Sequence, residues 1–261
     1  MDLFDLHGKV ALVTGGNGGI GLGMARALAS RGASIAIAGR NADKTSSAVA
    51  EVEALARDRD SGGRVLGLQV DVTDAGQVER MVASTCSELD GLDILVANAG
   101  TNLRKPPESY SLDEWCRIVD TNLTAVFVCC QTAYPELKRR GGGKMITIGS
   151  MTSIFGLNVA AAYTASKGGI VQLTRSLASA WARDNIQVNA ILPGWIDTDL
   201  TRMARQNVPG LHEKVLDRTP AGRWGVPDDL AGTAIFLSSR ASDFVTGVAL
   251  PVDGGFSSSM F

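Results

Sequence analysis

The feature that most constrains the fold is a glycine-rich loop between a short apolar strand and a helix near the start of the chain. We expect the strand over Lys9–Val13 and the helix over Leu22–Ser30, with the sequence T-G-G-N-G-G-I-G over residues 14–21 between them. A strand, a glycine loop and a helix in this order are typical of a dinucleotide site. An ordinary glycine-rich turn is the alternative, but a matching second strand, Ser34–Ala38, favours the dinucleotide site.

The glycines of this loop have a spacing that suits a bound pyrophosphate. Gly15, Gly19 and Gly21 permit a tight turn and bring backbone N–H groups to the start of the helix. Asn17 and Ile20 belong to the same loop, so we include them among the cofactor-binding residues.

Apolar runs alternate with amphipathic runs along the rest of the chain. Further strands are expected over Arg64–Val70, Leu92–Ala97, Lys144–Gly149, Ile186–Leu192 and Val248–Val252. Helices are expected over Ala42–Arg59, Asp74–Glu88 with Thr73 as its cap, Leu112–Arg139, Ala160–Arg183 and Pro227–Ser238. This alternation predicts an α/β fold, a single-domain Rossmann-type doubly wound parallel sheet with helices on both faces, over residues 1–261. The polar residues 198–219 are expected to form a mobile cover over the site.

Composition narrows the class of protein. A net charge of −2 gives no sign of a nucleic-acid or anionic-membrane partner, and no apolar run is long enough to span a bilayer. The four cysteines, Cys86, Cys116, Cys129 and Cys130, form no C-x-x-C pair and are interpreted as buried free thiols. With only two histidines, a metal site is not expected. We therefore expect a cytoplasmic protein without a membrane or nucleic-acid partner.

Three side chains after the strand at Lys144–Gly149 suggest proton transfer. Tyr163 and Lys167 are four residues apart and would share one face of a helix. A lysine ammonium favours the phenolate of a neighbouring tyrosine, whose ordinary pKa is about 10. Ser150, at the end of the strand, could hydrogen-bond a substrate oxygen. A helix with an unrelated tyrosine and lysine is the alternative.

The end of the second strand bears on the choice of cofactor. A nicotinamide cofactor without a 2′-phosphate usually meets an acidic residue there. Ala38 and Gly39 occupy these positions, and Arg40 follows them. Arg40 could pair with a 2′-phosphate or stack on adenine, whereas the glycine loop offers only Asn17 in place of a second cation. We predict that NADP(H) is preferred and that NAD(H) is possible.

Other candidates follow the ends of the predicted strands, the edge where parallel sheets bind ligands. Asn122 is a poor helix former within a predicted helix, so it indicates either a local kink, a satisfied core amide or a functional amide. The remaining cofactor candidates are Asp71, Val72, Asn98, Ala99, Gly100, Pro193, Gly194, Ile196 and Thr198.

The ordered set of motifs resembles the short-chain dehydrogenase/reductase family from Gly8 to Gly255. The set is Thr14-Gly15-x-x-x-Gly19-Ile20-Gly21, Asp71, Asn98-Ala99-Gly100, Asn122, Ser150, Tyr163-x-x-x-Lys167, Pro193-Gly194 and Asp253-Gly254-Gly255. The resemblance implies that Tyr163 is the acid/base, that Lys167 lowers its pKa and holds the nicotinamide ribose, and that Ser150 orients the substrate. It also implies that Asn122 supports a water connected to Lys167, that Asp71 meets the adenine and Asn98 the adenosine-side ribose, and that Ile196 and Thr198 meet the nicotinamide amide.

Within the family, the run N-A-G-T-N-L-R-K-P-P-E-S-Y-S-L-D-E-W resembles gluconate 5-dehydrogenases and 2-deoxygluconate 3-dehydrogenases. This implies a sugar acid or polyol substrate bound near Ser150, Tyr163, Arg104 and Trp195, with Arg104 as a partner for a carboxylate. A 3-ketoacyl-thioester reductase and a non-catalytic dinucleotide-sensing regulator are the alternatives. The shortage of a clearly polar face on the helices beginning near Leu112 and Ala160, together with the resemblance, predicts a homotetramer.

Overall fold

A single parallel sheet organises the chain in the computed structural model, which describes residues 2–58 and 62–259. The strand order is β3-β2-β1-β4-β5-β6-β7, and all neighbouring strands are parallel. The strands are β1 Val10–Thr14, β2 Ser34–Gly39, β3 Val65–Gln69, β4 Ile94–Ala97, β5 Gly143–Ile148, β6 Ile186–Pro193 and β7 Ala249–Val252. The order reverses between β1 and β4, and such a reversal opens a crevice at the carboxyl ends of the strands.

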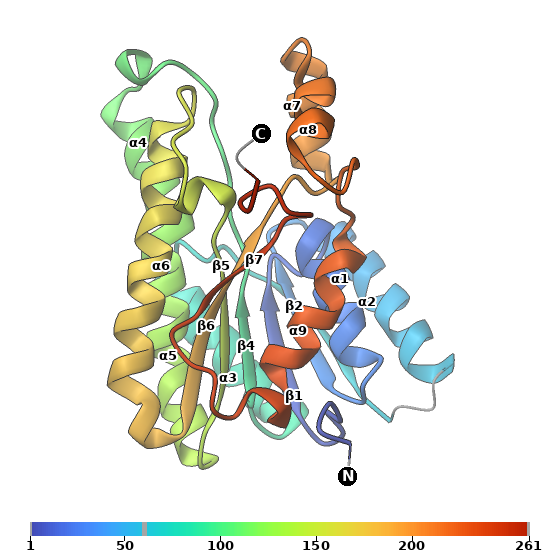
Figure 1. Cartoon of the computed structure of the whole chain (residues 1–261). Helices are drawn as coiled ribbons and strands as arrows, with labels where there is room; N and C mark the ends of the chain where they lie inside the picture. Colours follow the sequence, from blue (N-terminus) through green and yellow to red (C-terminus); the bar gives the residue numbers. More distant parts are fainter. Residues whose placement is uncertain (1, 59–61, 260–261) are drawn as a thin grey trace.

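Helices cover both faces of this sheet (Figure 1). One buried apolar cluster lies between the sheet and helices α3, α5 and α6, and a second lies between the sheet and α1, α2 and α9. The helices are α1 Gly19–Ala29, α2 Ala42–Asp58, α3 Ala75–Leu89, α4 Leu112–Val119, α5 Ala125–Arg139, α6 Ala161–Trp181, α7 Asp199–Asn207, α8 Leu211–Arg218 and α9 Ala231–Ser238. The predicted doubly wound α/β fold is therefore confirmed.

The predicted helix over Leu112–Arg139 is not one regular helix. A π-helical turn over Asp120–Thr124 separates α4 from α5 and contains the fully buried Asn122. A π-turn inserts one extra residue per turn and so re-aims the side chains that it carries. Asn122 therefore lies in a local irregularity of the helix, and its amide is buried and hydrogen-bonded.

Several smaller expectations are wrong. Asp74, not Thr73, caps α3, because its carboxylate accepts a hydrogen bond from the backbone N–H of Gln77 at 3.0 Å. All four cysteines are free, but Cys116 is exposed on α4, and Cys86 is only partly buried. Two predicted helices also include a 3₁₀ turn at one end: Ala182–Asp184 follows α6, and Pro227–Leu230 precedes α9. Arg59, the predicted end of the second helix, lies outside the described residues.

The predicted cover contains two helices that the sequence analysis did not anticipate. α7 and α8 stand beyond the carboxyl ends of the strands and are joined to β6 through residues 194–198 (Figure 1). None of the helices in residues 2–58 and 62–259 is long and apolar enough to cross a membrane.

Candidate active site

A groove of about 420 Å³ runs along the carboxyl ends of β1, β2, β4, β5 and β6. Most of the residues predicted to bind a cofactor line it: Gly15, Asn17, Gly19, Ile20, Arg40, Asp71, Val72, Asn98, Ala99, Gly100, Tyr163, Lys167, Pro193, Gly194, Ile196 and Thr198, together with the predicted catalytic Ser150. Gly21, Asn122, Arg104 and Trp195 do not line it. The predicted residues thus mark the groove, and the four exceptions lie behind or beside it.

The glycine loop fits a group that approaches the backbone closely. Gly15 has φ of +61°, and a Cβ atom there would lie 2.9 Å from the side-chain nitrogen of Asn98. A Cβ atom on Gly21 would lie 2.3 Å from the carbonyl oxygen of Gly15, so Gly21 supports the loop from beneath. α1 begins directly after this turn, and its free N–H groups suit an anionic pyrophosphate.

Two side chains predicted to touch the cofactor hold the loop in place. The Asn98 amide nitrogen donates to the carbonyl oxygens of Thr14 at 2.9 Å and Gly15 at 3.1 Å. The Asn17 amide nitrogen donates to the Thr45 hydroxyl at 3.0 Å, so it ties the loop to the first turn of α2. Asn17 therefore cannot serve simply as a substitute for a second cation.

The packing at the end of β2 leaves no room for the acidic residue that usually meets a cofactor without a 2′-phosphate. A Cβ atom on Gly39 would lie 2.1 Å from the side-chain nitrogen of Asn17, so the loop tether occupies the space that an acidic side chain would need. Arg40 is exposed at the rim of the groove, and its charge contributes to lowering the pKa of Asp71. The larger cause of that low pKa is a hydrogen bond from the backbone of Thr73.

Ser150, Tyr163 and Lys167 meet at the far end of the groove. The backbone N–H of Ser150 donates to the Ser153 hydroxyl at 3.1 Å, and that hydroxyl donates to the Lys167 carbonyl at 2.6 Å. This link fixes the end of β5 against α6. The Lys167 ammonium lies 5.7 Å from the centre of the Tyr163 ring and donates to the Ile148 carbonyl at 2.7 Å.

Burial dominates the ionisation of this pair. Burial raises the pKa of the Tyr163 phenol, while a hydrogen bond with Ser150 and the charge of Arg104 act in the opposite direction. Burial lowers the pKa of Lys167 to about 8. Ser150 and Arg104 are thus the groups that oppose the effect of burial and favour the Tyr163 phenolate.

Asn122 supports this end of the groove from behind. Its amide oxygen accepts a hydrogen bond from the Thr101 N–H at 2.8 Å, and its amide nitrogen donates to the Thr101 carbonyl at 2.8 Å and the Ser166 hydroxyl at 3.2 Å. A Cβ atom on Gly100 would lie 3.3 Å from this amide oxygen and 3.6 Å from the Lys167 ammonium. Asn122 and Lys167 therefore approach the same short segment of the groove wall.

Arg104 and Trp195 form a separate pair beside the reactive tyrosine. The guanidinium carbon of Arg104 lies 5.6 Å from the Trp195 ring centre, and the Trp195 ring packs edge-on against Trp224 at 5.5 Å. Burial lowers the pKa of Arg104, and the charge of Tyr163 opposes this shift. Within the described residues Arg104 forms no ion pair with a carboxylate, so its charge is available to a ligand next to Tyr163.

Two charged residues of the groove, Lys44 and Asp199, were not predicted from the sequence. Lys44 is the third residue of α2, whose first turn follows the end of β2. That position is a signal that could have identified it, because side chains of this turn face the carboxyl edge of the sheet. No comparable position in a predicted helix could have identified Asp199, because α7, the helix that it begins, was not expected from the sequence. In the described ranges, His, Cys, Asp and Glu side chains form no group of three or more that could hold a metal ion.

Comparison with known proteins agrees with this geometry. A family profile described as Enoyl-(Acyl carrier protein) reductase matches residues 15–257. A 2-dehydro-3-deoxy-D-gluconate 5-dehydrogenase of Formosa agariphila is 41% identical over 98% of this chain and 95% of its own length. The chain belongs to the short-chain dehydrogenase/reductase family. The resemblance deduced from the ordered motifs is therefore confirmed.

Two further short-chain dehydrogenases/reductases narrow the branch. A gluconate 5-dehydrogenase of Gluconobacter oxydans is 40% identical over 99% of this chain and 98% of its own length. A crystal structure of a gluconate 5-dehydrogenase from Burkholderia cenocepacia in complex with NADP and tartrate superposes with a TM-score of 0.90, at 39% identity and 99% coverage of both chains. Both relatives are gluconate 5-dehydrogenases, one of the two groups that the sequence resembles.

Proposed function

We propose that this short-chain dehydrogenase/reductase is an NAD(P)-dependent oxidoreductase that interconverts a secondary alcohol and a ketone on a sugar acid. The observation that supports this most strongly is the meeting of Ser150, Tyr163 and Lys167 at one end of the groove, with Arg104 beside Tyr163 and without an ion-pair partner among the described residues. Relatives named as gluconate and 2-dehydro-3-deoxy-D-gluconate dehydrogenases support the same substrate class. Residues 1–261 act as one domain in this proposal, with residues 198–219 as a mobile substrate cover.

The residues of the chain divide the proton chemistry among them. The Tyr163 phenol takes the proton of the substrate hydroxyl during oxidation and returns it to the carbonyl oxygen during reduction. Ser150 hydrogen-bonds the same substrate oxygen and holds it near the phenol. The Lys167 ammonium favours the phenolate in this proposal, and Asn122 supports a water connected to Lys167. Asn122 also keeps the adjoining wall at Thr101 in position through two hydrogen bonds. The bound nicotinamide cofactor supplies or accepts the hydride.

The groove residues suit a dinucleotide that carries a 2′-phosphate. The glycine loop would hold the pyrophosphate, Asp71 and Val72 the adenine, Asn98 the neighbouring ribose region, and Ile196 and Thr198 the nicotinamide amide. Because Asn17 fills the space beside Gly39, no acid at that position repels a phosphate. NADP(H) is therefore the preferred cofactor in this proposal and NAD(H) is possible, in accord with the NADP in the Burkholderia cenocepacia structure.

Arg104 would select an acid over a neutral polyol. Its guanidinium is half-buried, stacked on Trp195 and without a carboxylate partner in the described part of the chain, so a substrate carboxylate would satisfy it. The tartrate in the Burkholderia cenocepacia structure is itself a hydroxy acid. A charge-assisted hydrogen bond of ~1.5–3 kcal/mol corresponds to about a 10- to 150-fold preference for the acid.

The test compares D-gluconate with D-sorbitol, which has the same carbon chain without the carboxylate, using NADP⁺ as the oxidant. We expect the wild type to favour gluconate, and we expect Arg104→Met to raise KM for gluconate about 10-fold or more while changing sorbitol oxidation little. Arg57→Met is the matched control, because Arg57 is exposed on α2 and does not line the groove. Equal effects of Arg104→Met on both substrates would exclude the carboxylate role.

The same panel separates the alternative activities. Reduction of an acetoacetyl thioester with higher kcat/KM than any sugar acid would replace the proposal by the ketoacyl-thioester activity. Cofactor binding without turnover of any alcohol or ketone would favour the dinucleotide-sensing regulator, which has no need of the Ser150, Tyr163 and Lys167 arrangement.

The assembly is proposed to be a homotetramer that works in the cytoplasm. Leu112 and Trp115 on α4 and Phe127 on α5 are large apolar side chains that are exposed in a single chain, and α6 is rich in small residues. Such side chains are typical of a surface that another subunit covers. The four free cysteines suit a reducing compartment. Light scattering at micromolar concentration should give four times the mass of one chain, and a monomeric mass would exclude the tetramer.

A further inference from the structure

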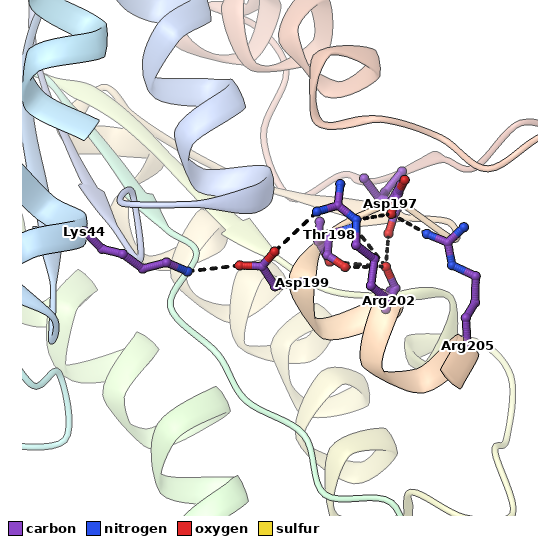
Figure 2. Close-up of polar contacts among 8 residues, drawn as sticks. Lys44, Asp197, Thr198, Asp199, Arg202 and Arg205 are labelled. Carbon is purple, nitrogen blue, oxygen red and sulfur yellow. Dashed lines mark hydrogen bonds and ion pairs between the residues drawn. The ribbon is translucent and has the colours of Figure 1, made fainter. Parts of the chain in front are cut away.

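An ion pair spans the groove at a place that the proton chemistry does not use (Figure 2). Lys44 lies in the first turn of α2, and Asp199 is the first residue of α7. The Lys44 ammonium donates to a carboxylate oxygen of Asp199 at 3.0 Å, and both residues line the groove. The pair therefore joins the dinucleotide side of the site directly to the cover.

Lys44 is well placed to meet a phosphate at the end of β2. A Cβ atom on Gly18 would lie 3.9 Å from the Lys44 ammonium, so this charge is held above the glycine loop. Arg40 lines the same groove, four residues earlier in the chain. Lys44 and Arg40 thus both lie near Gly39, where Asn17 fills the space that an acidic side chain would need.

Asp199 has a second partner on its own helix. The other carboxylate oxygen of Asp199 lies 3.4 Å from the guanidinium of Arg202, which also pairs with Asp197 at 2.9 Å (Figure 2). If Lys44 is removed from Asp199, the carboxylate keeps a counter-charge. The neighbouring Thr198 packs over the loop, since a Cβ atom on Gly19 would lie 3.3 Å from its methyl carbon.

The pair is exposed, so a stronger anion can displace its acidic member. The side chains of Lys44 and Asp199 are 58% and 74% exposed. Exposed pairs contribute little to stability, whereas a phosphate carries more charge than a carboxylate and offers three acceptor oxygens. A 2′-phosphate next to Lys44 would therefore compete effectively with Asp199.

We propose that Lys44 and Asp199 together determine cofactor specificity: Lys44 is the second cation for a 2′-phosphate, and Asp199 is an internal anion that competes with that phosphate for it. This inference rests on the dinucleotide site of the proposed function and deepens it. A dinucleotide without the 2′-phosphate leaves the pair between α2 and α7 intact. One with the 2′-phosphate takes Lys44, and Asp199 remains with Arg202.

The test measures binding of two cofactor fragments by calorimetry, adenosine 2′,5′-bisphosphate and adenosine 5′-monophosphate. Lys44→Gln should bind the bisphosphate about 3- to 10-fold more weakly, less than a fully buried charged contact would cost because Lys44 is exposed. Asp199→Asn should bind it about 1.4- to 5-fold more tightly, the equivalent of the ~0.2–1 kcal/mol of an exposed pair. Binding of the monophosphate should change less than about 2-fold in both variants.

Two controls and added salt make the result specific. Lys138→Gln and Asp184→Asn remove the two members of another ion pair, which joins α5 to the turn after α6 at 3.0 Å and does not line the groove, and both should leave the two affinities unchanged. The gain in Asp199→Asn should shrink as sodium chloride rises, because exposed charges are screened.

Each unfavourable result has a distinct meaning. If Asp199→Asn binds the bisphosphate no more tightly than the wild type, the competition is overturned. If Lys44→Gln weakens both fragments equally, Lys44 does not read the 2′-phosphate. A wild-type protein that binds neither fragment nor the full dinucleotides overturns the proposed function together with this inference, whereas unchanged ratios in the variants overturn the inference alone.

Discussion

Replacing Asn122 by alanine should destabilise the protein substantially, because one buried amide satisfies two backbone groups of the groove wall. The amide oxygen and nitrogen bond the N–H and the carbonyl of Thr101, each at 2.8 Å, and the nitrogen also reaches Ser166 at 3.2 Å. Leaving a buried polar group without a partner costs ~1–3 kcal/mol. Thr101 is only partly buried, so water can replace some of the loss. We therefore expect the free energy of unfolding to fall by about 2–4 kcal/mol.

Urea unfolding followed by tryptophan fluorescence at one fixed protein concentration measures this loss. Asn122→Asp should be destabilised as well, because a carboxylate can accept from the Thr101 N–H but would face the Thr101 carbonyl without a proton to donate. The control is Thr124→Ala in the same π-turn. The Thr124 hydroxyl is exposed and makes only a 3.4 Å contact with Asp120, so this change should stay within about 0.5 kcal/mol. An Asn122→Ala protein that unfolds within about 0.5 kcal/mol of the wild type would refute the reasoning.

Three further outcomes follow from the groove. Because burial lowers the pKa of Lys167 to about 8, the unfolded chain binds more protons than the folded one between pH 8 and the ordinary lysine pKa of ~10.4. The free energy of unfolding of the wild type, minus that of Lys167→Met, should therefore rise with pH in that window. Urea titrations in which this difference falls with pH would contradict the prediction. Arg40→Ala should lower the ratio of kcat/KM for NADP⁺ over NAD⁺ by about 10-fold or somewhat less, since Arg40 is exposed; an unchanged ratio would mean that Arg40 does not contact the phosphate. Gly39→Ala should displace Asn17 from Thr45 and lower stability by about 1 kcal/mol, and a thermal midpoint equal to that of the wild type would show that the loop adapts freely.

The sequence predicted the fold and the site best where the periodicity of apolar residues and the topology of a parallel sheet indicate the same arrangement. Alternating apolar strands and amphipathic helices required a parallel sheet, and a parallel sheet places every strand end at one edge, so Asp71, Asn98 and Ser150 could be assigned to one groove without coordinates. The strand ends differ from the expected ones by a residue or two. Such shifts do not matter to the site, because they leave each strand-end residue at the same edge.

Other features were not accessible from pattern. The sequence indicated an irregularity at Asn122, but the tertiary hydrogen bonds of its amide to Thr101 and Ser166 leave no signal in the periodicity. The helices α7 and α8 are polar on most sides, so their apolar signal is weak. The pair of Lys44 and Asp199 joins residues far apart in the chain, and only the folded arrangement brings them together.

We propose that Tyr163 transfers the proton while the groove binds the cofactor, and the substitution Tyr163→Phe separates these two roles. The substitution removes one hydroxyl and leaves the glycine loop, Lys167 and Arg104 in place. Cofactor affinity measured by calorimetry and turnover of gluconate with NADP⁺ should be determined on the same preparation. We expect an affinity for the cofactor close to that of the wild type, with turnover reduced by about 100-fold or more, the usual contribution of a general acid/base. Near-normal kcat in the variant would contradict it.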